Sequence, residues 1–182
     1  MEGELDLADL LREVVKESGQ ETVDLVIEHE LGGVKPEMID WWWGNIDSTE
    51  RYRLWHPQDH LFFEWEVPPT RGKHLGSIHV VVEKFGDTPP TRIRIRSEDP
   101  ASVPVPTTRS HVFAGSVVDR EGKPLLWIVH EYEEAPYGTK MRSTFRLPAK
   151  MPSFILEALR RHNREEMEKF TRFLPELYRK HL

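Results

Sequence analysis

The N-terminal part of the chain carries two regular hydrophobic patterns. Between Leu7 and Val15, leucine and valine side chains recur every three or four residues, which predicts an amphipathic helix. Gly19 follows where a helix C-cap is expected. From 22 to 31 apolar and polar residues alternate as in a strand, which a pair of glycines closes. Residues 1–33 are therefore predicted to form a short helix and a first strand.

A second helix and a long run of strands are expected next. Pro36 suits the first turn of a helix that runs through Trp41 to Trp43. From Leu61 onward the hydrophobic period changes to two, and short polar or proline-rich turns separate the segments. The predicted strands cover 61–67, 75–85, 92–96, 111–118, 125–133 and 140–147. Short loops between consecutive strands imply antiparallel pairing.

After Pro152 the hydrophobic period returns to that of a helix. Ser153 is the expected N-cap, and the helix should run to about Phe173, where Pro175 kinks or restarts it. The order of elements predicts an α+β fold in which a curved antiparallel sheet grips a long C-terminal helix.

Two polar residues stand on the apolar face of this last helix. At about 100° per residue, Glu166 falls in the middle of that face and His162 at its edge. A buried, unpaired carboxylate is costly, and side chains at i and i+4 project side by side, as two ligands of one metal would. The alternative is a slight rotation of the helix that turns Met167 inward and leaves Glu166 in a surface pair.

Other histidines and carboxylates occur where the pattern makes them notable. The segment WHPQDH (55–60) places two histidines and an aspartate beside an aromatic residue, which indicates a site, although loop histidines are often solvated. Glu83 shares a strand face with Leu75, His79, Val81 and Phe85, and either points into whatever that face covers or ends the strand in water. His130 alternates with apolar residues, which is more typical of a hydrogen-bonded core histidine than of a catalytic one.

Composition restricts the chemistry of such a site. The chain has 182 residues, a formal charge of −6, nine histidines and no cysteine. One domain covering 1–182 is expected. The acidic excess argues against nucleic-acid binding, and the lack of cysteine excludes disulfides, thiolate nucleophiles and sulfur-ligated zinc. We find no signal sequence and no apolar run long enough for a membrane helix, so a cytoplasmic protein without a membrane partner is expected.

Four segments together resemble the diacetylphloroglucinol hydrolase family, to which phloretin hydrolase belongs. They are PEMIDWWW (36–43), YRLWHPQDH (52–60), HVVVE (79–83) and the terminal HNREE with FLPELY (162–166 and 173–178). The resemblance covers most of the chain from about Gly33. It implies a Bet v 1-like (START-like) helix-grip domain that uses zinc to hydrolyse a carbon–carbon bond between an aromatic ring and an acyl group.

The resemblance also implies roles for individual residues. One zinc ion would be held by His56, Glu83, His162 and Glu166. Asp59 matches a polar residue that orients the substrate, for which the diacetylphloroglucinol enzyme has asparagine. Tyr52, Tyr137 and His60 are candidates for substrate binding, and His130 is our candidate for the acid that protonates the leaving ring carbon.

The predicted function is a zinc-dependent hydrolase that cleaves the acyl–aryl bond of a small aromatic ketone with metal-activated water. The alternative is a non-catalytic helix-grip carrier for a hydrophobic or aromatic small molecule. A metal-binding relative without hydrolase activity is a third candidate. Imidazole and carboxylate ligands also accept iron or manganese. In the family that these segments resemble, dimers form through an N-terminal extension. The N-terminal region is shorter in this chain, so dimerisation by that route stays open, and a homodimer is kept as one alternative.

Overall fold

The computed structural model describes residues 4–70 and 73–182, so the first three residues of the predicted N-terminal segment lie outside it. The elements, in chain order, are β1 (Leu5–Asp6), α1 (Leu7–Ser18), β2 (Thr22–Gly32), α2 (Pro36–Asn45), α3 (Thr49–Trp55), β3 (His60–Val67), β4 (Ile78–Glu83), β5 (Thr91–Glu98), the 3₁₀ turn η1 (Pro100–Ser102), β6 (His111–Val118), β7 (Pro124–Ala135), β8 (Gly138–Pro148) and α4 (Ser153–His181).

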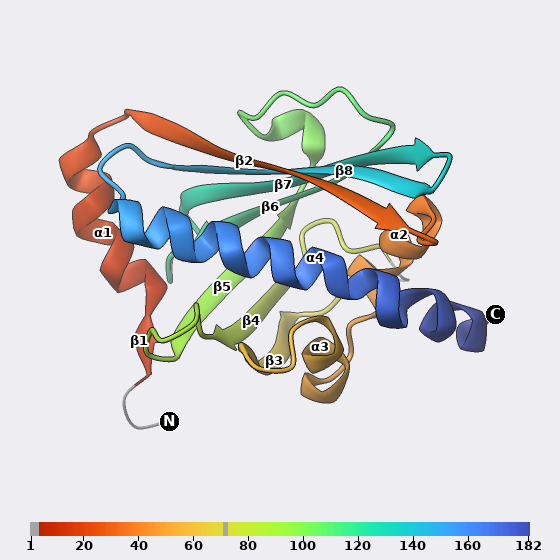
Figure 1. Cartoon of the computed structure of the whole chain (residues 1–182). Coiled ribbons are helices and arrows are strands. Elements are labelled where there is room, and N and C mark those ends of the chain that lie inside the picture. The colour runs from red at the N-terminus through yellow and green to blue at the C-terminus, as the bar shows by residue number, and fades with distance from the viewer. Residues whose placement is uncertain (1–3, 71–72) are drawn as a thin grey trace.

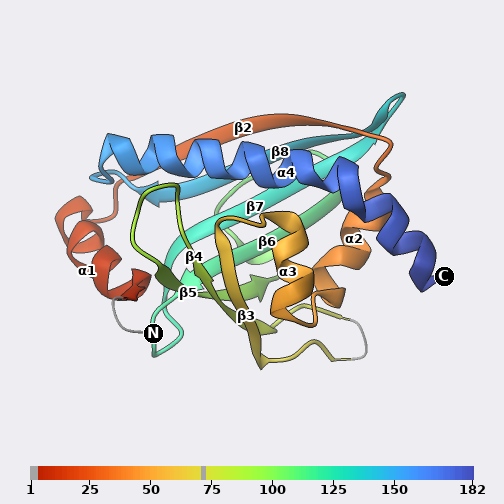
Figure 2. The ribbon, with the colours of Figure 1, turned by 60° about the horizontal axis from the view of Figure 1, so that its bottom comes forward.

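The strands form one curved sheet that holds α4 against its concave face (Figures 1 and 2). Its order is β2-β8-β7-β6-β5-β4-β3, with every neighbouring pair antiparallel. The short β1 pairs in parallel with the start of β5 and leads into α1, whose N-cap is Asp6. The expected antiparallel sheet gripping a long helix is confirmed.

The apolar face of α4 packs against the sheet and the tryptophans of α2 and α3. Met167, Phe170 and Leu174 are fully buried, and the ring of Phe170 stacks on Trp55. Glu166 is buried on the same side of the helix as Met167. The two alternatives for this helix are therefore not exclusive, because the buried face is wide enough to hold both side chains.

Helix α4 differs from the prediction at both ends. Ser153 is its first residue rather than its N-cap, which is Pro152 and makes no side-chain capping bond. The helix also continues through Pro175 to His181 instead of ending near Phe173. The missing N–H of a proline weakens a helix, but here packing on both sides of Pro175 compensates, since Leu174 is buried and Trp41 contacts the rings of Tyr178 and His181.

Two further differences lie near the site. Helix α3 was not predicted, because seven residues give too little periodicity, although Ser48 caps it by accepting a hydrogen bond from the Arg51 N–H. Strand β4 begins at Ile78 rather than at 75. Gly76 has φ 77°, which favours glycine and ends the extended pattern, and Leu75 is exposed. Leu75 therefore does not share the strand face of Glu83.

Candidate metal centre

The first half of the candidate centre lies at the edge of the sheet. Strand β3 begins at His60 and β4 ends at Glu83, and these two residues pair directly across the ladder. His60 Nδ1 lies 3.2 Å from the carbonyl oxygen of Tyr52, which only accepts, so Nδ1 carries the proton. The unprotonated Nε2 then faces Glu83 Oε1 at 3.9 Å and Glu166 Oε2 at 3.6 Å.

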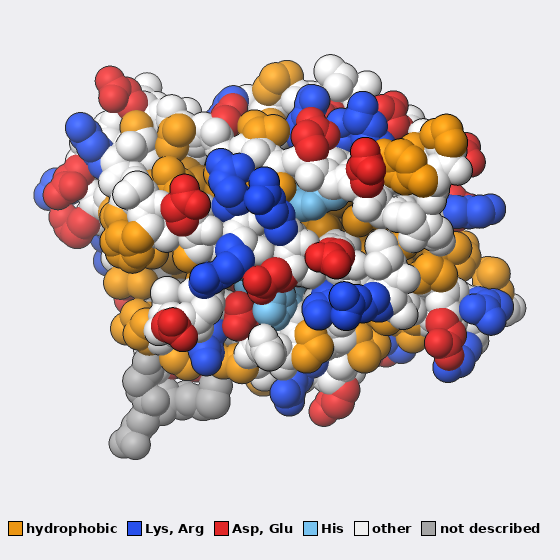
Figure 3. All heavy atoms as spheres, viewed as in Figure 1, with side chains coloured by type: hydrophobic (Ala, Val, Ile, Leu, Met, Phe, Trp, Pro, Cys, Tyr) orange, Lys and Arg blue, Asp and Glu red, His pale blue; other side chains and the backbone are white. Residues whose placement is uncertain are grey.

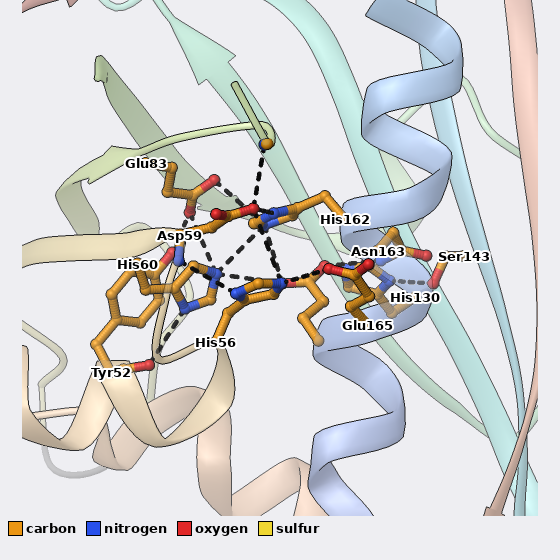
Figure 4. Close-up of polar contacts among 12 residues, drawn as sticks. Tyr52, His56, Asp59, His60, Glu83, His130, Ser143, His162, Asn163 and Glu165 are labelled. Carbon is orange, nitrogen blue, oxygen red and sulfur yellow. Dashed lines mark hydrogen bonds and ion pairs between the residues drawn. The ribbon is translucent and has the colours of Figure 1, made fainter. Parts of the chain in front are cut away.

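The second half comes from one turn of α4. His162 Nδ1 lies 3.2 Å from Asp59 Oδ2, which directs Nε2 towards the sheet edge. From there Nε2 is 3.3 Å from His60 Nε2, 3.7 Å from Glu83 Oε2 and 3.8 Å from Glu166 Oε2. Figure 4 shows the side chains of His60, Glu83 and His162 pointing towards one another from α4 and the two strands. Two imidazole nitrogens and the Glu83 carboxylate thus lie close enough together to hold one metal ion, and Glu166 Oε2 lies within 3.8 Å of both nitrogens.

The nitrogens of His60 and His162 and the carboxylate of Glu83 fit three ligand positions of one metal ion, and Glu166 lies beside them. Ligand atoms about 2.0–2.1 Å from zinc lie about 3.3–3.4 Å apart at tetrahedral angles. The two Nε2 atoms are separated by 3.3 Å, and the carboxylate oxygens lie only a few tenths of an ångström farther out. The residues present therefore match the donor set and spacing that zinc requires.

The charges of the cluster also favour a cation. Asp59, Glu83 and Glu166 are all buried, and within 4–70 and 73–182 their ion pairs involve only histidines, with no lysine or arginine. Buried carboxylates need compensating positive charge. Burial lowers the pKa of His60 to about 3, so this ring stays neutral and able to ligate.

The cluster stabilises the protonated, positively charged form of His162. Burial disfavours its protonated form, but the hydrogen bond to Asp59 and the charges of Glu166 and Glu83 outweigh burial and raise the pKa of His162 to about 9. The hydrogen bonds from His162 and the Gly86 N–H likewise outweigh burial and lower the pKa of Asp59. A proton on His162 occupies the place of the charge that a metal would bring, so metal binding would release it.

Outer hydrogen bonds fix the orientation of each candidate ligand. The Tyr52 hydroxyl donates to Glu83 Oε1, and Asn163 Nδ2 donates to Glu166 Oε1 at 2.8 Å. Asp59 holds His162, as a carboxylate often holds the far nitrogen of a metal-bound histidine. These hydrogen bonds thus orient the candidate ligands without the help of a metal ion.

His56, the histidine that the resemblance favoured, faces a different set of atoms. Its Nδ1 accepts a hydrogen bond from the Asp59 N–H at 3.2 Å, and its Nε2 lies 3.0 Å from Glu165 Oε2. Its ring stacks on that of His162 at 4.7 Å. Two groups of described residues can therefore hold a metal, His60–Glu83–His162 and His56–Asp59–His162, and they share His162. In the first group, the Nε2 atoms of both His60 and His162 also lie within 3.8 Å of Glu166 Oε2.

An apolar cavity of about 420 Å³ begins at the ligand cluster and extends between α1, the sheet and the start of α4. Its polar side chains are few: Tyr52, His79, Glu83, His130, His162 and Glu166, besides the tryptophan indoles. Leu10 and Phe154, at its outer end, are 49% and 66% exposed. Figure 3 shows hydrophobic side chains gathered over α1 and the first turns of α4. The cavity therefore suits a largely apolar ligand that enters there.

His130 lies in the cavity wall at the end of a hydrogen-bonded chain. Asn163 Nδ2 donates to Glu166, so its Oδ1 faces His29 Nε2 at 3.0 Å and requires a proton there. His29 Nε2 also lies 3.1 Å from Ser143 Oγ, which then donates to His130 Nδ1 at 2.8 Å. Burial lowers the pKa of His130 to about 4. The neutral ring therefore carries its proton on Nε2.

The remaining predicted site residues lie in different places. Tyr52 lines the cavity, but its hydroxyl is held by Glu83. Tyr137 is exposed in the turn between β7 and β8 and does not line the cavity, so we leave it out of the proposed site. The sequence reading missed Asn163, Ser143 and His29, whose single polar groups on apolar faces were the available signal.

Fold and site together define the class of this protein as a Bet v 1-like helix-grip protein with an apolar cavity and a histidine–carboxylate cluster that can hold a metal. Solved structures with the same architecture include Ara h 8.0201 (TM-score 0.58, 13% identity, covering 86% of this chain and 99% of that one). The KanY protein gives a TM-score of 0.60 at 10% identity, over 85% and 99% of the two chains. At these identities the likeness shows the fold alone.

The particular family follows from the sequence match. Residues 17–156 match the model of the DAPG hydrolase PhiG domain, and the chain belongs to this family, as the resemblance predicted. A stretch of 69 residues is 35% identical to phloretin hydrolase of Eubacterium ramulus, covering 32% of this chain and 25% of that protein. The match thus spans about a quarter of the relative's length. No helix in the described parts of the chain is long and apolar enough to cross a membrane.

Proposed function

We propose that this protein is a zinc-dependent hydrolase that cleaves the carbon–carbon bond between an acyl group and an electron-rich aromatic ring. The observation that carries the proposal is the meeting of two oriented imidazole nitrogens and two carboxylates at the inner end of an apolar cavity. Membership of the DAPG hydrolase PhiG domain family supports the reaction class.

The ligands we assign to zinc are His60, Glu83, His162 and Glu166. Three of them are those the resemblance implies, and His60 replaces His56 because of its position beside Glu83 and Glu166. Zinc held there would polarise a ketone oxygen and lower the pKa of water towards 7. Asp59 orients His162 rather than the substrate, since its carboxylate is bonded to His162 Nδ1 and to the Gly86 N–H.

The second proton of water goes to the ring carbon, and His130 assists this transfer by hydrogen-bonding the substrate through its Nε2 proton, because a neutral imidazole is too weak an acid to lose that proton itself. Hydrolysis adds the OH of water to the acyl carbon, and the ring carbon leaves with the electron pair of the broken bond and takes up a proton. The ring of His130 lies against Trp43, at 5.5 Å between centroids, and Ser143 holds its Nδ1, so the Nε2 proton is the one available to a ligand. The surrounding apolar walls exclude bulk water from this step.

Elemental analysis and turnover test this proposal together. About one zinc per purified chain, with release of a phenol and a carboxylic acid from a panel of acylphenols, is the expected result. A chain that binds acylphenols but holds no metal would be the carrier instead. A chain that holds zinc but cleaves none of the panel would be a metal-binding relative without this activity. Chelator-treated protein is the control, because it should bind the same compounds without cleaving them.

Ser143→Ala should lower turnover without removing the metal. The variant leaves His130 Nδ1 without its hydrogen bond, so the ring can adopt the other tautomer and rotamer. We expect kcat to fall by about tenfold to a hundredfold, with zinc content and KM close to those of the parent. Ser116→Ala is the matched control, since Ser116 is equally buried but bonds to Glu98 on β5. An unchanged kcat in Ser143→Ala would show that His130 does not depend on this chain of hydrogen bonds.

A further inference from the structure

Trp43 forms part of the cavity wall, and a hydrogen bond holds its indole. The indole lies parallel to the ring of His130, with 5.5 Å between centroids and 5° between planes. Its Nε1 donates to the hydroxyl of Tyr132 at 3.2 Å. By contrast, the indole nitrogens of the two preceding tryptophans are buried and make no hydrogen bond within the described residues. A polar contact therefore fixes the orientation of Trp43 but not those of its neighbours on α2.

The partner of Trp43 is itself held by a carboxylate. Tyr132 lies on β7 two residues after His130, so both side chains leave the same face of the strand. Its hydroxyl donates to Asp40 Oδ1 at 2.7 Å. Asp40 lies three residues before Trp43 on α2, so these two side chains leave the same side of the helix. Asp40, Tyr132 and Trp43 together form what we call the hydroxyl network.

The direction of each hydrogen bond in the hydroxyl network is fixed by its chemistry. An indole N–H only donates and an ionised carboxylate only accepts. Burial and then the charge of Asp40 raise the pKa of Tyr132, so its hydroxyl keeps the proton that it donates. His111 meets the other oxygen of Asp40, Oδ2, and the bond from Tyr132 does not depend on it. The hydroxyl thus accepts from the indole and donates to the carboxylate.

This arrangement determines the plane of the His130 ring. Ser143 holds His130 at Nδ1, but one hydrogen bond leaves a ring free to turn about it. The parallel indole of Trp43 covers one face of the imidazole and removes that freedom. Two contacts from different elements are therefore needed to aim Nε2 into the cavity. Neither Asp40 nor Tyr132 lines the cavity, so any effect they have on a ligand passes through Trp43.

We infer that Asp40 and Tyr132 are positioning residues, which hold Trp43 against His130 and so set the direction in which His130 Nε2 meets the substrate. The inference rests on the proposed function for the role of His130 in turnover. The orientation of the two rings is a property of the protein without substrate and is measured separately.

Tyr132→Phe tests the inference, because it keeps the buried ring and removes only the hydroxyl. NMR of the full chain measures the exchange of the Trp43 indole N–H with solvent and the shifts of the His130 ring protons, which the parallel indole shields. Trp43→Phe and His130→Gln assign these signals. In Tyr132→Phe the indole N–H should exchange about three- to tenfold faster, as expected for the loss of one hydrogen bond. The His130 ring protons should lose part of their upfield shift.

The same variant should lose turnover without losing metal or substrate. With an acylphenol that the parent cleaves, we expect kcat to fall about tenfold, with KM within about twofold and zinc content as in the parent. Tyr178→Phe is the matched control, since Tyr178 contacts the ring of Trp41, which does not line the cavity. It should leave the NMR signals of Trp43 and His130 and the value of kcat unchanged.

Substitutions of Asp40 separate positioning from a general loss of packing, because its side chain is 46% exposed. Asp40→Asn keeps an oxygen that accepts from Tyr132 and should resemble the parent. Asp40→Ala should show smaller changes of the same sign as Tyr132→Phe, since the hydroxyl keeps the indole but loses the acceptor that holds it.

Three results overturn the inference: unchanged NMR signals in Tyr132→Phe, an unchanged kcat despite changed signals, or an Asp40→Asn variant no better than Asp40→Ala. If the parent cleaves no acylphenol, the NMR signals alone decide whether the hydroxyl network sets the plane of His130. Failure to cleave then counts against the proposed function and not against the positioning.

Discussion

Replacing His162 with alanine is expected to abolish stoichiometric zinc binding and, with it, hydrolysis. His162 belongs to both groups of described residues that can hold a metal, so its removal takes a ligand from either site. Because even outer contacts of metal ligands change affinity by about tenfold to a hundredfold, loss of a direct ligand should exceed a hundredfold. The measurement is zinc content per chain by elemental analysis, together with zinc titration of the chelator-treated protein.

The matched control for this variant is His111→Ala. His111 is a partly exposed histidine on β6 that pairs with Asp40 and does not line the cavity. It should keep the zinc content and activity of the parent. If His162→Ala retained about one zinc per chain, neither candidate group would be the metal site.

Substitutions of His60 and of His56 are expected to have opposite effects on zinc content. His60→Gln removes the nitrogen that faces Glu83 and Glu166, so we expect loss of zinc and of activity. His56→Gln removes a ring whose Nε2 faces the half-exposed Glu165, so zinc content should stay near one per chain. Glutamine fills much of the space of the ring, which limits the damage to packing around the fully buried His60.

Thermal unfolding with and without zinc gives a second measure of the same pair. A ligand that binds only the folded chain raises its stability, so zinc should raise the Tm of the parent and of His56→Gln but not of His60→Gln. The reverse pattern would assign the metal to His56, as the family resemblance implies, and would place it between Asp59 and His162.

The fold could be predicted because hydrophobic period is a local property. The alternation along β5 to β8 and the helical period of α4 determined the fold class without knowledge of contacts. The features that the hydrophobic pattern did not predict depend on packing between segments. Pro175 is tolerated inside α4 because Leu174 is buried and Trp41 packs on the last turn, and α3 is too short to show a period.

The candidate site was predicted in part for the same reason. The position of Glu166 on an apolar face and of Glu83 beside Val81 followed from period alone, and both side chains are buried. The choice between His56 and His60 depends on two facts that a sequence does not carry. One is the register that pairs His60 with Glu83, and the other is the Tyr52 carbonyl that fixes the proton on His60 Nδ1.

The cavity is closed on one side by α1, and this has a practical consequence for protein engineering. Leu7, Leu10, Leu11 and Val14 of this helix line the ligand space. The described residues before the helix join the sheet through β1, the Glu4–Arg92 ion pair and the Leu5 N–H bond to the Pro90 carbonyl. An affinity tag or fusion partner joined just upstream of Leu5 would therefore pull on a wall of the binding site. Figure 1 shows the C-terminal end of α4 on the side of the molecule opposite to α1, and the last turns of α4 do not line the cavity, so tags are better attached there.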